Sequence, residues 1–104
     1  MKLEELFEIV EEQSQASIGK SWTAKLISRG PQKCAEKFGE EAIEAIIEAI
    51  REDKGALIKE AADVLFHLFV MLKSQDVHLV DVLKELESRQ RQSGLAEKTS
   101  RVSY

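Results

Sequence analysis

The sequence has few of the residues that interrupt or cross-link a chain. Its 104 residues include one cysteine, one proline and five glycines. A single cysteine cannot form an internal disulfide, so a disulfide-stabilised small domain is excluded and a reducing cytoplasm is the expected location. Because proline and glycine are so scarce, turns should be few and secondary-structure elements long.

Long hydrophobic runs are also missing. The first five residues, Met1 to Glu5, contain no apolar signal region. The longest apolar stretch, residues 61–72, contains Asp63 and His67 and is too short to cross a bilayer. The net charge of -4 argues against non-specific binding to DNA or to anionic membranes. We therefore expect a soluble cytoplasmic protein with neither nucleic acid nor membrane as partner.

Hydrophobic periodicity predicts an all-α fold. No segment alternates with period two, whereas the 3.6-residue period is visible almost throughout. We predict a single domain over residues 1–91, with four helices at about 2–17, 31–51, 56–74 and 76–91. The polar tail, residues 92–104, is assigned to the same domain. So short a chain builds only a modest core, and the four-helix bundle is expected to be completed by dimerisation.

Two of these helices carry carboxylates at helical spacing. On the second helix, Glu41 and Glu44 share one face, and a set of apolar residues forms the opposite arc: Ala42, Ile43, Ile46, Ala49 and Ile50. The third helix is apolar almost all round, which is typical of a buried helix, yet it carries Glu60 and Asp63 three residues apart. An antiparallel hairpin closed at Gly55 would bring the two acidic pairs face to face.

Four converging carboxylates repel one another unless cations lie among them. Oxygen ligands without a cysteine or histidine cluster favour Mg²⁺, with Mn²⁺ as the alternative, over zinc. Since Mg²⁺ is commonly bound by carboxylates together with substrate phosphates, the pattern predicts a nucleotide polyphosphate as substrate. The competing interpretation is a set of buried acids paired with Lys or Arg across a helix interface.

A basic block precedes these acids. Residues 20–37 contain five basic side chains and one acidic side chain, whereas residues 38–63 contain eight acidic and three basic ones. Lys and Arg neutralise phosphate oxygens, and Arg can contact two of them at once. Candidates for phosphate binding are Lys25, Arg29, Lys33 and Lys37, although solvated surface positions are an equally simple interpretation of each.

The motifs resemble a known family. Lys37-x-Gly39-Glu40-Glu41-Ala42-x-Glu44, followed by Glu60-Ala61-Ala62-Asp63-x-Leu65-x-His67, is similar to the paired acidic motif of the phosphoribosyl-ATP pyrophosphohydrolases. These are all-α, MazG-like nucleotide pyrophosphohydrolases of histidine biosynthesis. Ser21-Trp22-Thr23-Ala24-Lys25-Leu26 and Ser93-Gly94-Leu95-x-Glu97-Lys98 resemble two further signatures of the same family, in which tyrosine is more usual at position 22.

The resemblance implies Mg²⁺-dependent hydrolysis of phosphoribosyl-ATP to phosphoribosyl-AMP and pyrophosphate by a homodimer. It implies that Glu41, Glu44, Glu60 and Asp63 are the catalytic metal ligands, with Glu40 as a further ligand or as a residue that orients one. Trp22 would allow aromatic stacking with the substrate. Lys98 and Arg101 in the tail would join the basic block in substrate binding. His67, four residues after Asp63, is either its hydrogen-bond partner or a structural histidine.

Two other functions are open at this point. One is a housekeeping pyrophosphohydrolase of the same superfamily that acts on free nucleoside triphosphates, for which the same acids would serve. The other is a non-catalytic helical interaction module whose acids only shape a polar interface. Such a module would neither bind metal nor release pyrophosphate.

Overall fold

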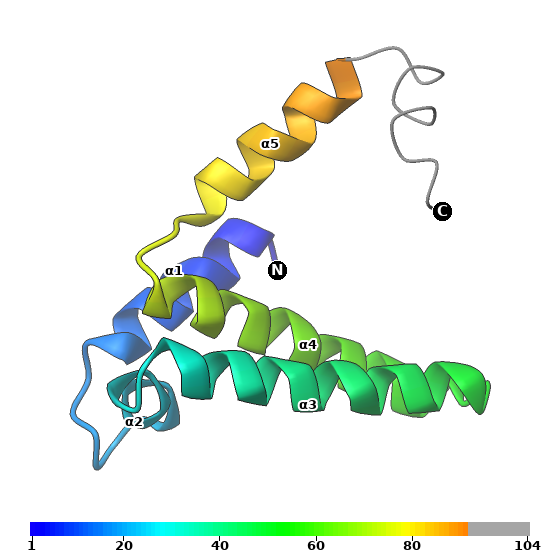
Figure 1. Ribbon diagram of the computed structural model, residues 1–104, viewed down its shortest axis with the longest axis horizontal. Coiled ribbons are helices and arrows are strands. Elements are labelled where there is room, and N and C mark those ends of the chain that lie inside the picture. The colour runs from blue at the N-terminus through cyan, green and yellow to red at the C-terminus, as the bar shows by residue number, and fades with distance from the viewer. Residues whose placement is uncertain (92–104) are drawn as a thin grey trace.

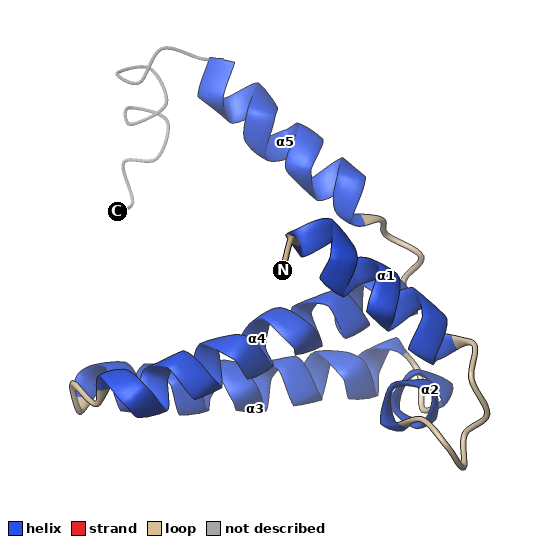
Figure 2. Cartoon of the chain, turned by 180° about the vertical axis from the view of Figure 1, so that it is seen from behind, coloured by secondary structure: helices blue, strands red, loops and turns tan. Residues whose placement is uncertain are grey.

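The computed structural model describes residues 1–91, and these residues form helices without any strand (Figure 2). The predicted all-α class is therefore confirmed. The described part of the chain contains five helices rather than the four expected: α1 (Leu3–Ser14), α2 (Trp22–Ser28), α3 (Pro31–Ile50), α4 (Lys54–Ser74) and α5 (Leu79–Arg91). None of the helices in residues 1–91 is both long and apolar enough to span a membrane.

The additional helix is α2, which lies in the basic stretch between the first two predicted helices. It has only seven residues, so it shows little periodicity, but its start is well capped. The Ser21 hydroxyl accepts a hydrogen bond from the Ala24 N–H at 3.1 Å and donates one to the Gln13 carbonyl at 2.9 Å. The first bond satisfies a helix N-terminal donor, and the second ties α2 to the end of α1.

Helices α3 and α4 form a long antiparallel hairpin, and α1 and α2 pack at one end of it (Figure 1). Helix α3 begins as predicted at Pro31, after Gly30 with a φ of 96°. The prediction that the hairpin closes at Gly55 was wrong, because Gly55 lies inside the first turn of α4. Instead Glu52 adopts a left-handed conformation (φ 61°), and Asp53 caps α4 by accepting from the Ala56 N–H at 3.0 Å.

The core lies where α1, α2 and α5 meet the hairpin. The rings of Phe7 and Phe69 pack edge to face with centroids 5.5 Å apart. The buried core residues come from all five helices: Phe7, Val10, Leu26, Cys34, Phe69, Val70 and Leu79. Helix α5 contributes its first residue to this core and then extends away from the hairpin (Figure 1). The far end of the hairpin has no such cover from the described residues.

The expected burial of α4 was wrong, and α3 also exposes its apolar side chains. The apolar arc of α3 is largely exposed, with Ile43 and Ile46 each 58% accessible and Ile50 76% accessible. Helix α4 is not buried all round, since Ile58 is 71% accessible and Asp63 is exposed as well. The other described helices cover only part of the hairpin, so apolar side chains remain exposed on the rest of it. Exposed apolar side chains in such numbers are typical of a surface that another protein covers.

Several helix ends also differ from the prediction. Helix α1 ends at Ser14 rather than near residue 17. Helix α5 begins at Leu79 rather than near residue 76, because Asp76 takes a left-handed conformation (φ 56°) and His78 caps the helix by accepting from the Val80 N–H at 3.0 Å. These differences move turns by a few residues and leave the acidic helices in place.

Candidate metal and nucleotide site

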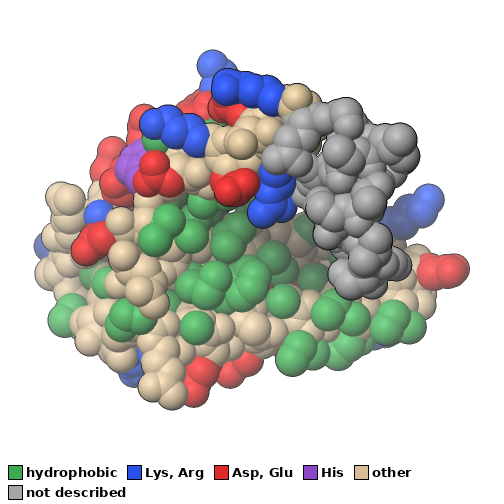
Figure 3. Space-filling model, turned by 45° about the horizontal axis from the view of Figure 1, so that its top comes forward, with side chains coloured by type: hydrophobic (Ala, Val, Ile, Leu, Met, Phe, Trp, Pro, Cys, Tyr) green, Lys and Arg blue, Asp and Glu red, His purple; other side chains and the backbone are tan. Residues whose placement is uncertain are grey.

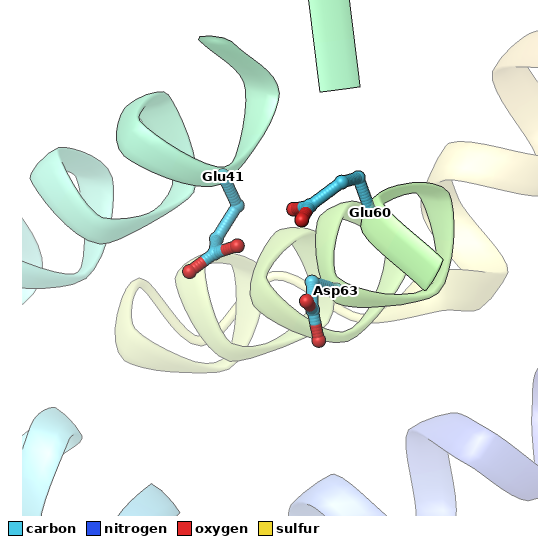
Figure 4. Close-up of side chains that lie close together, drawn as sticks. All are labelled: Glu41, Glu60 and Asp63. Carbon is cyan, nitrogen blue, oxygen red and sulfur yellow. The ribbon is translucent and has the colours of Figure 1, made fainter. Parts of the chain in front are cut away.

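Three carboxylates from the two hairpin helices converge on one point. Glu41 comes from α3, and Glu60 and Asp63 come from α4, one turn apart (Figure 4). One carboxylate oxygen from each lies within 4.8 Å of the other two. Glu41 is buried, Glu60 is half-buried and Asp63 is exposed. The cluster thus runs from the helix interface to the surface, where a ligand from solvent can reach it.

Glu44 belongs to the edge of this group. A hydrogen bond between the Glu44 and Glu60 carboxyl groups raises the pKa of Glu44, and the negative charges of Glu41 and Glu60 raise it further. Glu60 Oε2 is buried and has no hydrogen-bond partner among the described residues. A buried carboxylate oxygen without a donor is costly. An all-carboxylate donor set with an unsatisfied oxygen fits a hard divalent cation such as Mg²⁺.

Lys37 is the basic side chain closest to the cluster. Its Nζ lies 3.1 Å from Glu41 Oε1 and 3.7 Å from Glu40 Oε2. The hydrogen bond to Glu41 is the main cause of a raised pKa at Lys37, so its ammonium group is charged at neutral pH. Glu40 itself is exposed and contacts this lysine rather than the other carboxylates.

His67 lies one turn beyond Asp63 on α4 and is 93% buried, since only 7% of its surface is accessible. Burial lowers its pKa, although the charges of Glu41 and Asp63 act in the opposite direction. Its Nδ1 atom is buried without a hydrogen-bond partner among the described residues, so the predicted bond to Asp63 is not made through that atom. The side chain packs edge to face against Phe66.

Glu48 is a further acid on α3, which the sequence analysis did not include in the site. Its Oε1 is buried, lies 3.5 Å from Arg51 Nη1 and makes no hydrogen bond. Glu48 follows Glu44 by four residues, so both lie on the same face of α3, and this spacing could have identified Glu48 from the sequence. Glu48 lies outside the group of three converging carboxylates.

The remaining candidates for substrate binding are spread over the neighbouring surface. Trp22, the first residue of α2, is 52% accessible, and Lys25 and Arg29 are exposed on and just after the same helix. Lys33 pairs with Glu36 at 3.3 Å rather than with a cluster carboxylate. Lys98 and Arg101 lie outside the described residues.

Comparison with known proteins decides the family. The sequence profile of phosphoribosyl-ATP pyrophosphohydrolase matches residues 3–90, which include all five helices up to the last turn of α5 and every cluster carboxylate. The chain belongs to the phosphoribosyl-ATP pyrophosphohydrolase family. Membership in this family confirms the resemblance that the motifs indicated, and it makes the chain a hydrolase.

Curated relatives in the phosphoribosyl-ATP pyrophosphohydrolase family match over nearly their whole length. A phosphoribosyl-ATP pyrophosphatase of Roseobacter denitrificans is 59% identical over 101 residues, covering 97% of this chain and 96% of the relative. A protein of the same name from Cereibacter sphaeroides is 60% identical over 99 residues, covering 95% and 96%. Another from Ruegeria pomeroyi is 58% identical over 99 residues, covering 95% and 94%.

Proposed function

We propose that the chain hydrolyses phosphoribosyl-ATP to phosphoribosyl-AMP and pyrophosphate, a step of histidine biosynthesis. The observation that carries this proposal is the convergence of Glu41, Glu60 and Asp63 in a chain whose relatives are named phosphoribosyl-ATP pyrophosphatase. Breaking a phosphoanhydride needs charge stabilisation on the leaving pyrophosphate and an activated water, and an oxygen-lined cation site supplies both.

Mg²⁺ would be held by Glu41, Glu60 and Asp63, with Glu44, which interacts with Glu60, and Glu40, which shares Lys37 with Glu41, as further candidate ligands. The bound ion would polarise the phosphoanhydride and lower the pKa of a water molecule. The support for this assignment is the short spacing of the oxygens and the unpartnered Glu60 Oε2. One carboxylate of the group would accept the proton of the attacking water.

The basic side chains next to the cluster would hold the phosphates. Lys37 is already in contact with Glu41, so a phosphate near the cation would lie within its reach. Lys25, Arg29 and Lys33 on α2 and the start of α3 would extend the positive surface. The half-exposed Trp22 ring would stack against the substrate's adenine. Lys98 and Arg101 keep the substrate-binding role that the sequence predicts for them.

Pyrophosphate release across a substrate panel tests the proposed function. The purified chain is assayed with phosphoribosyl-ATP, ATP, dCTP and dUTP, each with Mg²⁺ and with EDTA. We expect Mg²⁺-dependent release from phosphoribosyl-ATP and little from the three free triphosphates. A preference for a free triphosphate would favour the housekeeping activity. Absence of release from every substrate would favour the non-catalytic interaction module.

We also propose that two copies associate through the exposed apolar ridge of the hairpin. The ridge consists of six large aliphatic side chains that are each at least 41% accessible: Ile43, Ile46, Ile47, Ile50, Ile58 and Leu65. Hydrophobic side chains also gather over a broad area of the face shown in Figure 3. So large a set of exposed aliphatic residues is typical of a surface that another protein covers. A second copy carries the same ridge and so provides a self-complementary surface.

The dimer is tested with a matched pair of variants. Ile46→Glu places a charge in the middle of the ridge, whereas Ile18→Glu changes an isoleucine of similar accessibility (56%) in the connection between α1 and α2. Sedimentation velocity should give a dimer for the wild type and Ile18→Glu and a monomer for Ile46→Glu. A wild-type monomer, or an Ile46→Glu dimer of unchanged affinity, would contradict this interface.

A further inference from the structure

Lys37 makes a contact that competes with the proposed cation. Its ammonium group is bound to Glu41, the most buried of the three converging carboxylates, at 3.1 Å. It also bridges to Glu40 at 3.7 Å. The Glu41 side chain is only 10% accessible, whereas that of Lys37 is 31% accessible, so the carboxylate end of the ion pair is shielded from solvent and the ammonium end is partly solvated. The charge of Glu41 is therefore screened less than that of a surface carboxylate.

A carboxylate cannot offer its full charge to a lysine and to a divalent cation at once. When a cation binds at Glu41, a neighbouring ammonium group repels it, and the lysine must either move or weaken the binding. Lysine is suited to moving because its charge sits at the end of a flexible four-carbon stem. A phosphate group that arrives with the substrate gives the ammonium group a new anionic partner.

We propose that Lys37 is a tethered counter-ion that weakens divalent-cation binding at the carboxylate cluster until nucleotide phosphates accept its ammonium group. The inference rests on the proposed function, since it uses the same carboxylates and the same substrate class. It makes cation binding and nucleotide binding cooperative, because each ligand removes an obstacle to the other. The coupling must be reciprocal, so the cation tightens nucleotide binding by the same factor.

No other lysine or arginine of the described residues makes this contact. Lys33, one turn earlier on α3, pairs with Glu36 at 3.3 Å, and the two side chains are 46% and 54% accessible. Arg51 is at the other end of the helix and pairs with Glu48. Lys33 therefore provides a matched control, because it is a lysine on the same helix, in an ion pair of similar length, outside the carboxylate cluster.

The test measures cation binding without nucleotide, using Mn²⁺ alone as the probe. Free Mn²⁺ is titrated by electron paramagnetic resonance against the wild type, Lys37→Met and Lys33→Met. Methionine keeps the length and apolar stem of lysine and removes the charge. We expect Lys37→Met to bind Mn²⁺ about three to ten times more tightly, with the difference shrinking at high salt. Lys33→Met should match the wild type within about twofold, because its charge is screened by solvent.

Lys37→Met should show the opposite change toward substrate. In Lys37→Met the KM for phosphoribosyl-ATP should rise, because the phosphates lose a cationic partner, while Mn²⁺ alone binds more tightly. Damage to the fold would weaken both, and circular dichroism checks helicity directly. Lys37→Arg, which keeps the charge, should bind Mn²⁺ as weakly as the wild type.

The outcomes separate this inference from the proposed function. If the wild type binds Mn²⁺ and Lys37→Met binds it no more tightly, the counter-ion role is wrong and the metal site stands. If neither the wild type nor Lys37→Met binds Mn²⁺ at millimolar concentration, both the metal site and the counter-ion role are wrong. Tighter Mn²⁺ binding by Lys37→Met, together with a raised KM, supports the inference.

Discussion

The substitution Glu60→Gln should make the protein more stable without metal and less stable with it. Glu60 contributes one of the three carboxylate oxygens that lie within 4.8 Å of one another. Glu44 is a further carboxylate neighbour, and its interaction with Glu60 raises the pKa of Glu44. Glutamine keeps the size of the side chain and its capacity to accept a hydrogen bond, and removes the negative charge.

The size of the effect follows from the distances. Two unit charges 4.8 Å apart repel by about 0.9 kcal/mol at the dielectric constant of water and by about 3.5 kcal/mol at an effective value near 20. Glu60 has two such neighbours, Glu41 and Asp63, so removing its charge relieves roughly 2 kcal/mol even at the lower figure. For a domain of this size, that corresponds to a rise in Tm of about 10 °C.

Thermal unfolding in EDTA and in saturating Mg²⁺ gives the decisive comparison. In EDTA the Tm of Glu60→Gln should exceed that of the wild type. In Mg²⁺ at 100 times the Kd, the wild type gains about 2.7 kcal/mol and the variant gains much less, so the order should reverse. Glu36→Gln, which removes an exposed carboxylate paired with Lys33, should show neither effect. A Glu60→Gln protein that is less stable than the wild type in EDTA would refute the argument from repulsion.

Three further predictions concern the surroundings of the site. Burial lowers the pKa of His67, so the folded state favours the neutral imidazole more than the unfolded state does. The stability that His67 provides is therefore full above pH 6.5 and is lost as the pH falls through the lower pKa of the folded state. The difference in Tm between the wild type and His67→Phe should change with pH in that window. Burial also raises the pKa of the Cys34 thiol, so it should react with a thiol reagent at pH 8 only after unfolding. Ser21→Ala should lower the free energy of unfolding by about 1–2 kcal/mol in a urea titration, because it removes the cap of α2 and the bond to Gln13.

Helical periodicity predicted the acidic helices because their patterns are local. The spacing of Glu60 and Asp63 places both on one face of α4 wherever that helix lies. The start of α3 was predictable from Pro31, which suits the first helical turn. The all-α class followed from the same evidence. The metal-binding and catalytic roles of these acids stay predictions.

The exposed apolar arc of α3 could not be predicted from the pattern. An amphipathic helix shows which face is apolar, but not whether its own chain or another covers that face. In this fold α3 turns Cys34 and Glu41 inward and leaves Ile46 and Ile50 outside. Because an apolar face is usually buried within the same chain, the pattern taken alone favours the reverse arrangement.

Two other errors came from contacts that a linear pattern does not contain. Helix α2 is stabilised at its start by Ser21, whose hydroxyl reaches the carbonyl of Gln13 eight residues earlier. The turn between α3 and α4 depends on a left-handed Glu52, and a non-glycine residue in that conformation gives no clear signal in a sequence. The turn was predicted at Gly55 instead, because glycine is common in turns, although Gly55 is helical.

The hydrolysis rate of Asp63→Asn tests the central claim most directly. Asp63 is exposed, so the substitution should leave the helical circular dichroism unchanged, and the control Asp81→Asn changes another exposed aspartate, in the first turn of α5. With phosphoribosyl-ATP and saturating Mg²⁺, the account predicts that Asp63→Asn loses at least about 100-fold in kcat/KM, as is typical when a group that stabilises transition-state charge is removed. It predicts wild-type turnover for Asp81→Asn. Near-wild-type turnover by a folded Asp63→Asn protein would contradict the claim that the carboxylate cluster carries the reaction.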